Sequence, residues 1–262
     1  MPSLSIYMIT LDEEKRLPRT LNAIRNLADE IIIVDSGSKD KTMEIARSFG
    51  AKIFQREWDN YSSQKAYAES LTSGDWLMNL DADEEVSREL AVEIRNTIEK
   101  GKNDVYRVKI ADVFPGQARP HPLVKCYNVF RLYRRNCAKM GQTNNWDRIG
   151  FCNDNVRKGQ LKGRIFHHSF ISLDHTLRKY NSYTDEQLKG AQETGRKYPP
   201  FRLLLAMNLN FLKYFFLYRH FLYGWWGYIN AVNQSYLRFL KFAKFYESQC
   251  DNEGEDMSRG RQ

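Results

Sequence analysis

The sequence predicts an α/β protein: a mostly parallel sheet with flanking helices, followed by a helical C-terminal appendage rich in aromatic and basic residues. Two observations support this prediction. Short apolar strands alternate with amphipathic helices from residue 4 to residue 85, which is typical of a parallel, nucleotide-binding sheet. Two of these strands also stop at aspartates, Asp35 and Asp81. Because such sheets bind ligands beyond the carboxyl ends of their strands, we expect the functional site at that edge.

The composition is that of a folded protein with a basic surplus. The chain has 262 residues, of which 42% are hydrophobic and 27% are charged, so it can bury a full core. Its 40 basic and 32 acidic side chains leave a net charge of +8, which favours anionic partners such as nucleotides, phospholipid head groups or nucleic acid. The four cysteines have no C-x-x-C spacing, so we expect a reduced, cytoplasmic compartment and no zinc site. We expect no transmembrane helix, because no uncharged apolar run is long enough.

The spacing of apolar residues predicts the elements of the N-terminal half: alternation indicates strands, and steps of three and four residues indicate helices. An apolar strand covers 4–10, and Pro18 begins a helix whose apolar residues recur at three- and four-residue steps. Ser87 or Asp83 is expected to cap a helix over 87–99. The elements between them are a strand at 30–34, a helix that ends near 49, a strand at 51–55, a helix at 62–71 and a strand at 76–80.

After residue 100 the regular alternation ends. We expect strands at 105–113, 124–133 and 163–167, a region of mostly loop over 139–163 and a polar helix over 172–195. The expected domains are a nucleotide-binding domain over 1–170, a helical region over 171–247 and a disordered tail over 248–262.

Residues 77–85, Leu-Met-Asn-Leu-Asp-Ala-Asp-Glu-Glu, end an apolar strand at two aspartates. In an extended chain residues i and i+2 point to the same side, so Asp81 and Asp83 can converge on one hard cation. Alternatively the acids only begin the next helix, where Glu84 and Glu85 suit its positive end. An Asp-x-Asp pair alone does not decide between these interpretations.

Asp35 ends the second strand and is followed by a polar turn that contains one glycine, Gly37. A carboxylate there can accept hydrogen bonds from ribose hydroxyls or from a base. Alternatively it caps the helix that follows. Neither a G-x-x-x-x-G-K-[ST] loop nor a G-x-G-x-x-G fingerprint occurs in the chain, which argues against a P-loop NTPase.

Three stretches together resemble the ordered motifs of family 2 glycosyltransferases with the Rossmann-like GT-A fold. They are Thr-Leu-Asp-Glu-Glu at 10–14, Ile-Val-Asp-Ser-Gly-Ser-Lys-Asp-Lys-Thr at 33–42 and Gly-Asp-Trp-Leu-Met-Asn-Leu-Asp-Ala-Asp-Glu at 74–84. Asn-Tyr-Ser-Ser-Gln-Lys at 60–65 and Phe-Arg-Leu-Tyr-Arg-Arg at 130–135 resemble bacterial lipopolysaccharide core glycosyltransferases. The resemblance reaches about residue 247. It implies a GT-A catalytic domain, a nucleotide-sugar donor, namely a UDP-sugar, and a glycolipid acceptor.

The resemblance implies a donor site on the first two motifs. Thr10, Glu13 or Glu14, and Asp35 would hold the uridine of a UDP-sugar. Lys65 would face the diphosphate, where a cation offsets charge on the leaving group. Taken by itself, Lys65 is more simply a solvated helix residue.

The resemblance also implies a metal site. Asp81 and Asp83 would bind Mg²⁺ or Mn²⁺ at the diphosphate, with Asp83 as the direct ligand. His167 matches a histidine common in this branch, and it would ligate the metal or touch the diphosphate. His168 points the other way on a strand, and a structural role for His167 is the alternative. Arg131 and its neighbours at 134 and 135 would contact phosphate groups or form a solvated edge.

An inverting transfer needs a carboxylate base for the acceptor hydroxyl. The branch usually reads Val-His-Glu there, whereas this chain has Phe-Cys-Asn-Asp-Asn-Val at 151–156. Asp154 would then be the base, although Asn153 in place of the histidine is a departure from the pattern. Asp147 is the alternative base, and turn chemistry explains Asp154 equally well.

The segment 201–246 interleaves aromatic residues and cations, which suits a membrane interface with anionic lipids. We therefore expect a peripheral enzyme at the inner face of the bacterial inner membrane. The alternative is a helical hairpin packed on the catalytic domain or on another copy in a homo-oligomer. Two other classes compete with a transferase: a basic nucleic-acid-binding protein, which leaves the acidic motifs unexplained, and a sugar-phosphate nucleotidyltransferase, whose glycine-rich signature loop is absent.

Overall fold

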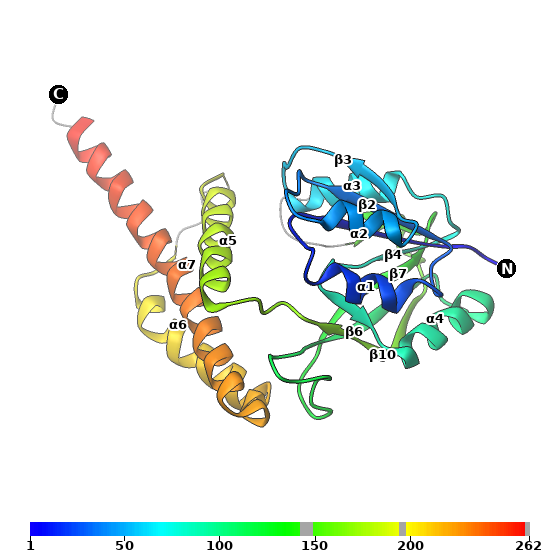
Figure 1. Ribbon diagram of the computed structural model, residues 1–262. Helices are drawn as coiled ribbons and strands as arrows, with labels where there is room; N and C mark the ends of the chain where they lie inside the picture. Colours follow the sequence, from blue (N-terminus) through cyan, green and yellow to red (C-terminus); the bar gives the residue numbers. More distant parts are fainter. Residues whose placement is uncertain (142–148, 194–197, 260–262) are drawn as a thin grey trace. The chain divides into compact units, whose positions relative to one another are not determined.

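The computed structural model describes residues 1–141, 149–193 and 198–259. The chain divides into two compact units (Figure 1). The first, which we call the sheet unit, comprises Met1–Val113 and Cys126–Ser169. The second, the helical unit, comprises Phe114–Lys125 and Phe170–Gln262. The sequence places a boundary at 170, but it does not assign 114–125 to the helical unit.

An eight-stranded sheet forms the sheet unit, in the order β3-β2-β1-β4-β7-β6-β10-β5. The strands β3, β2, β1 and β4 run parallel, while β7 is antiparallel to both of its neighbours. This arrangement confirms the predicted α/β class with a mostly parallel N-terminal half. The strands are β1 (Leu4–Thr10), β2 (Glu30–Asp35), β3 (Lys52–Gln55), β4 (Trp76–Asn79), β5 (Glu84–Val86), β6 (Val105–Asp112), β7 (Tyr127–Arg134) and β10 (Lys158–His167).

Helices cover both faces of this sheet because successive strand residues point to opposite sides. In β1, Ile6 belongs to the same apolar cluster as Leu21 and Leu90, whereas Tyr7 belongs to the cluster of Ala68. The Ser87 hydroxyl caps α4 by accepting a hydrogen bond from Leu90 N at 3.2 Å, which confirms one of the two predicted caps. The helices are α1 (Leu17–Ile24), α2 (Thr42–Ser48), α3 (Tyr61–Ser70) and α4 (Arg88–Lys100).

Three short strands were missed by the sequence analysis. The region 139–163, expected to be mostly loop, contains β8 (Ala138–Met140) and β9 (Ile149–Phe151), which pair with each other, and β10 already begins at Lys158. Glu84 and Glu85, for which the start of the next helix was the alternative interpretation, instead lie in β5, which pairs with the end of β10. A three-residue strand has too little periodicity to be recognised, and its partner is distant in the chain.

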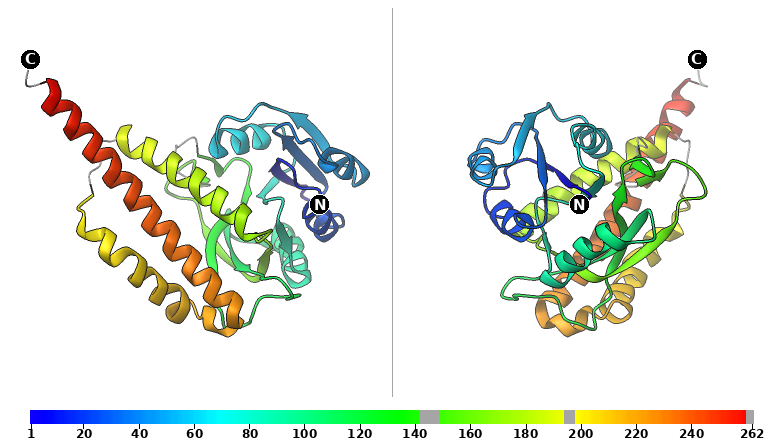
Figure 2. Two further views of the ribbon diagram at one scale, coloured as in Figure 1. Left: turned by 60° about the vertical axis from the view of Figure 1, so that its left-hand side comes forward. Right: turned by 90° about the vertical axis from the view of Figure 1, so that its right-hand side faces the viewer.

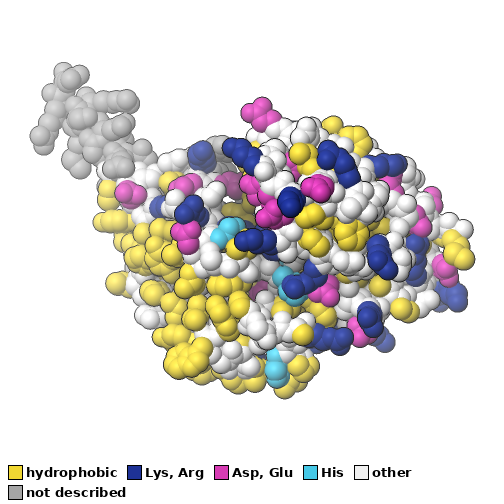
Figure 3. Space-filling view, in the orientation of Figure 1, with side chains coloured by type: hydrophobic (Ala, Val, Ile, Leu, Met, Phe, Trp, Pro, Cys, Tyr) yellow, Lys and Arg dark blue, Asp and Glu magenta, His cyan; other side chains and the backbone are white. Residues whose placement is uncertain are grey.

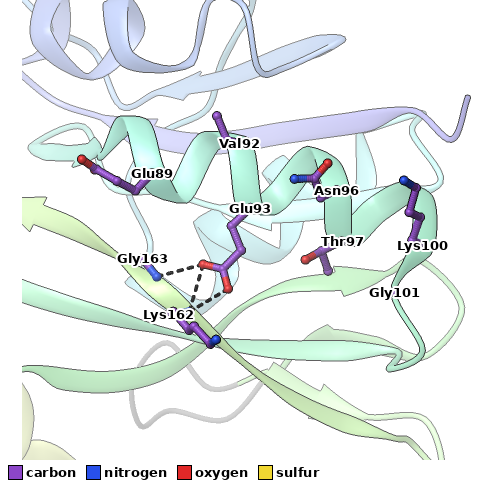
Figure 4. Close-up of a pocket in the computed structure, with 9 residues that line it drawn as sticks. All are labelled: Glu89, Val92, Glu93, Asn96, Thr97, Lys100, Gly101, Lys162 and Gly163. Atoms are coloured by element: carbon purple, nitrogen blue, oxygen red, sulfur yellow. Dashed lines mark hydrogen bonds between the residues drawn. The ribbon is translucent and has the colours of Figure 1, made fainter.

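A hollow lies on the outside of the sheet unit between α4 and β10 (Figure 4). There the Glu93 carboxylate accepts hydrogen bonds from the backbone N of Lys162 and Gly163, at 2.9 and 2.8 Å. A Cβ on Gly163 would lie 2.6 Å from Leu90 Cα, so only glycine permits this approach. These contacts fasten the irregular middle of β10 to α4, and we assign the hollow a structural role.

The helical unit contains α5 (Leu173–Glu193), α6 (Phe201–Leu212), the π-helical turn η1 (Lys213–Leu217), the 3₁₀ turn η2 (His220–Tyr223) and α7 (Gly224–Arg259). Figure 2 shows α6 and α7 side by side, and Asn210 Nδ2 donates to Gln234 O between them at 2.7 Å. The chain reverses through Arg219 and Gly224, which both have positive φ. Helix α7 continues past residue 247 to Arg259, where the sequence predicted a disordered tail. Among the described residues, no helix has the length and apolarity that a membrane span requires.

Candidate active site at the carboxyl edge of the sheet

Asp35 lies buried at the end of β2, directly opposite Thr10 at the end of β1. Thr10 Oγ1 donates to Asp35 Oδ2 at 2.8 Å, and the backbone N of Gly37 and of Ser38 donate to Oδ1 at 3.0 and 2.8 Å. Asp35 thus organises the turn after β2, and it does not cap α2, which begins at residue 42. Gly37 supplies the positive φ of 99° that this turn needs.

The turn after β1 is tied to the turn after β2. Glu13 N donates to Thr42 Oγ1 at 2.7 Å, and Glu14 N donates to Asp40 Oδ2 at 3.0 Å. The Glu14 carboxylate in turn accepts from Lys41 N at 3.2 Å. The two turns that the sequence assigned to the donor therefore form one hydrogen-bonded edge, in which the backbone positions are already fixed.

Asp81 lies just beyond β4 in a cluster of buried charges. Lys65 Nζ lies 2.6 Å from Asp81 Oδ1, and Arg131 Nη2 lies 3.0 Å from Asp81 Oδ2. Arg131 also binds Glu84 Oε1 at 2.8 Å and the side chain of Asn79. Lys65 is only 2% exposed, so the interpretation of it as a solvated lysine is wrong. The cluster holds the Asp81 carboxylate between two cations.

The pKa values of the two acids in this cluster move in opposite directions. Burial raises the pKa of Asp81, but Lys65 and Arg131 outweigh it and hold that pKa below its ordinary value. Burial also raises the pKa of Glu84, to about 7, against the attraction of Arg131 and with the help of the Asp81 charge. Asp81 is consequently the charged member of the pair.

Asp83 lies in a second group of charges, apart from the ion pairs of Asp81. Arg16 Nη1 lies 3.0 Å from Asp83 Oδ2, and His167 Nε2 lies 3.5 Å from the same oxygen. His167 Nδ1 lies 3.0 Å from Asp112 Oδ1. Burial opposes the charge on His167, but Asp83 and Asp112 outweigh it and hold the pKa of His167 well above its ordinary value. The two histidines diverge as expected, since His168 Nε2 instead lies 2.9 Å from Glu85.

This edge fits a divalent cation at Asp83 better than at Asp81. No group of three or more His, Cys, Asp or Glu within the described ranges is arranged to hold a metal, so the predicted convergence of Asp81 with Asp83 and His167 is not present. Asp83 and His167 nevertheless approach each other, and Asp112 on the second nitrogen of His167 is the kind of contact that orients a ligating imidazole. Asp81 lies between two cations, Lys65 and Arg131, whereas Asp83 pairs with one guanidinium, that of Arg16.

Asp154 is exposed in the turn between β9 and β10. Three residues later, Arg157 Nη2 lies 3.0 Å from Asp104 Oδ1, next to the start of β6. His167 stands at the other end of the ten-residue β10, a span of roughly 30 Å at ~3.3 Å per residue. The register therefore places Asp154 at the edge opposite the charge clusters. Asp147, the alternative base, lies outside the described residues.

Arg16 and Asp112 were not foreseen as site residues. Arg16 follows Glu13 by one helical turn, and its Nε donates to Glu13 Oε2 at 2.7 Å. Its contact with Asp83 spans 67 positions of the chain, and no local pattern in the sequence could have indicated it. Arg131 was expected either at a phosphate group or on a solvated edge, and the structure instead buries it against Asp81 and Glu84.

The sheet and its charged carboxyl edge define an α/β protein of the nucleotide-binding type. Residues 5–157, more than half of the chain, match the family described as glycosyl transferase family 2. The chain belongs to this family and is a glycosyltransferase. Membership decides against the nucleic-acid-binding and nucleotidyltransferase alternatives.

Several relatives resemble the chain over most of its length. An uncharacterized glycosyltransferase of Rickettsia typhi is 36% identical over 259 residues, covering 94% of this chain and 88% of the relative. The lipopolysaccharide core biosynthesis glycosyltransferase LpsC of Rhizobium meliloti is 26% identical and covers 93% and 92%. The crystal structure of S. aureus TarS 1–349 in complex with UDP-GlcNAc matches with a TM-score of 0.48 at 16% identity, over 87% of this chain and 79% of the TarS 1–349 chain.

Proposed function

We propose that this protein transfers a sugar, with inversion, from a UDP-sugar to a lipopolysaccharide core or related glycolipid. The observation that carries the proposal is the continuous edge formed by the ends of β2, β1 and β4. There the fixed Thr10 and Asp35 turn adjoins the strand that leads into Asp81 and Asp83. A nucleotide end and a phosphate end are thus available side by side.

The donor is assigned along this edge from β2 to β4. The Asp35 and Thr10 end, with Glu13 and Glu14 on the linked turn, holds the uridine and its ribose. The diphosphate lies toward Asp83. When bound there, Mg²⁺ or Mn²⁺ supplies Lewis acidity that stabilises departing UDP.

Lys65 and Arg131 keep the phosphate end organised. Both are held in place by Asp81, so their positions do not depend on a bound donor. Preorganised charge of this kind lowers the barrier because it need not reorient during the reaction. Asp81 thus positions cations, while Asp83 and His167, the latter in its neutral form, would hold the metal.

The reaction replaces one C–O bond of the anomeric carbon with another and transfers one proton. The acceptor oxygen bonds to the anomeric carbon, the bond from that carbon to the diphosphate oxygen breaks, and the hydroxyl proton passes to a carboxylate. Of the two candidate bases we favour Asp147, because Asp154 belongs to the segment bound at the opposite edge through Arg157 and Asp104.

The acceptor class rests on the whole-length similarity to LpsC and on the motifs at 60–65 and 130–135. We place the enzyme at the cytoplasmic face of the inner membrane, where such an acceptor would be found. Comparing the lipopolysaccharide of a deletion strain with that of its parent by mass spectrometry identifies the missing sugar and its attachment point together. An unchanged lipopolysaccharide would overturn the acceptor assignment.

The donor class is tested separately with the purified protein. UDP release is measured over a panel of UDP-sugars with Mn²⁺, with Mg²⁺ and with a chelator. We expect release from one sugar and its loss on chelation. Absence of both UDP binding and UDP release across the panel would overturn the donor assignment.

A further inference from the structure

We propose that an exposed apolar face of the helical unit binds the surface of an anionic lipid bilayer. This apolar face consists of a stripe along α6 and η1, namely Phe201, Leu205, Leu209, Leu212 and Phe216, and of a tip formed by Leu217, Phe221 and Trp225. The inference deepens the proposed function by naming the surface at which the enzyme works, and it is tested without donor or acceptor.

The stripe is a single helical face that remains uncovered. Its members recur at steps of four, four, three and four residues, which places them on one side of a helix. Their exposed fractions are 58% for Phe201, 49% for Leu205, 60% for Leu209, 51% for Leu212 and 56% for Phe216. A run of five large apolar side chains, each about half in contact with solvent, indicates a binding surface.

The opposite side of α6 faces α7, so the stripe is not the core side of this helix. Ala206 is buried there, and the polar Asn210 reaches Gln234 O of α7. A soluble helix normally buries its large apolar residues and exposes its polar ones. In α6, Ala206 and Asn210 face the neighbouring helix, and four of the five leucines, namely Leu204, Leu205, Leu209 and Leu212, are exposed.

The tip extends this apolar face around the turn between α6 and α7. Leu217 is 65% exposed, Phe221 45% and Trp225 80%. Trp225 packs edge-on against Tyr228, which is itself 45% exposed. Hydrophobic side chains gather over this part of the molecule in Figure 3. Tryptophan and tyrosine with one apolar and one wet side are enriched at the boundary between acyl chains and head groups.

The positive charge of residues 194–246 favours an anionic partner. From residue 194 to residue 246 the sequence contains no aspartate and no glutamate, but it contains eight basic residues. Eight equals the net charge of the whole chain, so the rest of the protein is neutral overall. The basic residues are Arg196, Lys197, Arg202, Lys213, Arg219, Arg238, Lys241 and Lys244.

This combination favours an anionic bilayer over the other occupants. A second copy would bring the same cations together, and like charges oppose such a contact. A nucleic acid would meet the cations but would leave the leucines without an apolar partner. A bilayer of anionic lipids satisfies both, since the apolar face enters the acyl boundary and Lys213 and Arg219 meet the head groups.

The test is co-sedimentation of the full chain with vesicles. We expect binding to vesicles of phosphatidylethanolamine and phosphatidylglycerol, weaker binding to pure phosphatidylcholine, and release as salt is raised. Leu209→Ser and Phe216→Ser should each weaken partitioning about tenfold, because each removes one large apolar side chain. Lys213→Glu with Arg219→Glu should abolish the preference for anionic vesicles.

Val92→Ser is the matched control, since Val92 is 63% exposed on α4 of the sheet unit and should leave vesicle binding unchanged. Circular dichroism verifies that each variant is folded. Equal binding by wild type and by Phe216→Ser would overturn the proposal. A second result would also overturn it: the wild type does not bind vesicles, sediments as a dimer, and becomes a monomer in Leu209→Ser. UDP release in solution should be unaffected in all of these variants. Failure of the membrane proposal can therefore be distinguished from failure of the donor proposal.

Discussion

Arg16 Nη1 lies 3.0 Å from Asp83 Oδ2, and the same guanidinium is also held by Glu13. Asp83, which we assign to the metal, therefore already forms an ion pair with an arginine of its own chain. A divalent ion that approaches Asp83 has to compete with Arg16 for this carboxylate. The contact links the turn after β1 to the acids after β4 and makes the metal assignment testable through Arg16.

Replacing Arg16 should strengthen metal binding in the absence of donor. In Arg16→Ala we expect about fivefold tighter Mn²⁺ binding, since a partly buried ion pair contributes about 1 kcal/mol. Titration calorimetry of the donor-free protein measures it. Arg19→Ala is the control, because the Arg19 guanidinium contacts His168 and Glu85 instead of Asp83. An unchanged Mn²⁺ affinity in Arg16→Ala would contradict a metal at Asp83.

Asp83→Ala should remove metal-stimulated UDP release and leave the protein folded. The side chain is 9% exposed and pairs with both Arg16 and His167, so its removal leaves two cations without their acid and we expect a loss of stability of about 3 kcal/mol, less than the total stability of a typical domain. UDP release by the variant and by the wild type is measured with and without Mn²⁺. The thermal midpoint of the same samples shows whether the variant is folded. Undiminished, metal-dependent turnover in this variant would show that the metal lies elsewhere.

Asp81→Ala should act mainly on stability. It removes the carboxylate that compensates Lys65 and Arg131, and breaking a buried ion pair from one side costs about 3 kcal/mol or more. Urea denaturation measures the free energy of unfolding. Asp75 is an exposed aspartate just before β4, so Asp75→Ala provides the control and should lower the free energy of unfolding much less. Equal losses in the two variants would mean that the Asp81 cluster does not stabilise the edge.

The two candidate bases are separated by a pair of conservative changes. We expect Asp147→Asn to retain UDP binding and to reduce transfer by at least about a hundredfold, the usual contribution of a general base. Asp154→Asn should transfer at the wild-type rate, because Asp154 lies at the opposite edge of the sheet. The reverse result would return the base to Asp154.

Glu30 should make the fold sensitive to acid. Burial opposes its ionisation, but hydrogen bonds from Lys52, Ser5 and Ser73 outweigh burial and lower its pKa from 4.5 to about 2. Between these values the unfolded chain binds more protons than the folded one, so this part of the stability is present above pH 4.5 and is lost as pH falls toward 2. Glu30→Gln should have a lower free energy of unfolding than the wild type at neutral pH. On acidification, that free energy should fall less in the variant than in the wild type. Urea midpoints across this range measure the difference, and parallel curves would contradict it.

The sheet strands beyond residue 80 show which elements the sequence predicted and which it did not. The strands around 105–112 and 127–134 alternate well enough to be recognised, whereas β5, β8 and β9 have three residues each and were missed. Such strands form because a partner is in place, and that partner lies far along the chain. The base was assigned to Asp154 from the motif, although the register of β10 with β6 places that residue at the far edge.

The sequence by itself determined the α/β class, the order of the N-terminal elements and the acidic motifs at the strand ends. These features depend on local periodicity and on residue type, and both can be read directly along the chain. The tertiary structure decided which cation each acid meets: Lys65 and Arg131 at Asp81, and Arg16 and His167 at Asp83. It also decided that four of the five leucines of α6 are exposed. These relationships join residues that are far apart in sequence or depend on which side of a helix is covered, and only the packed fold determines them.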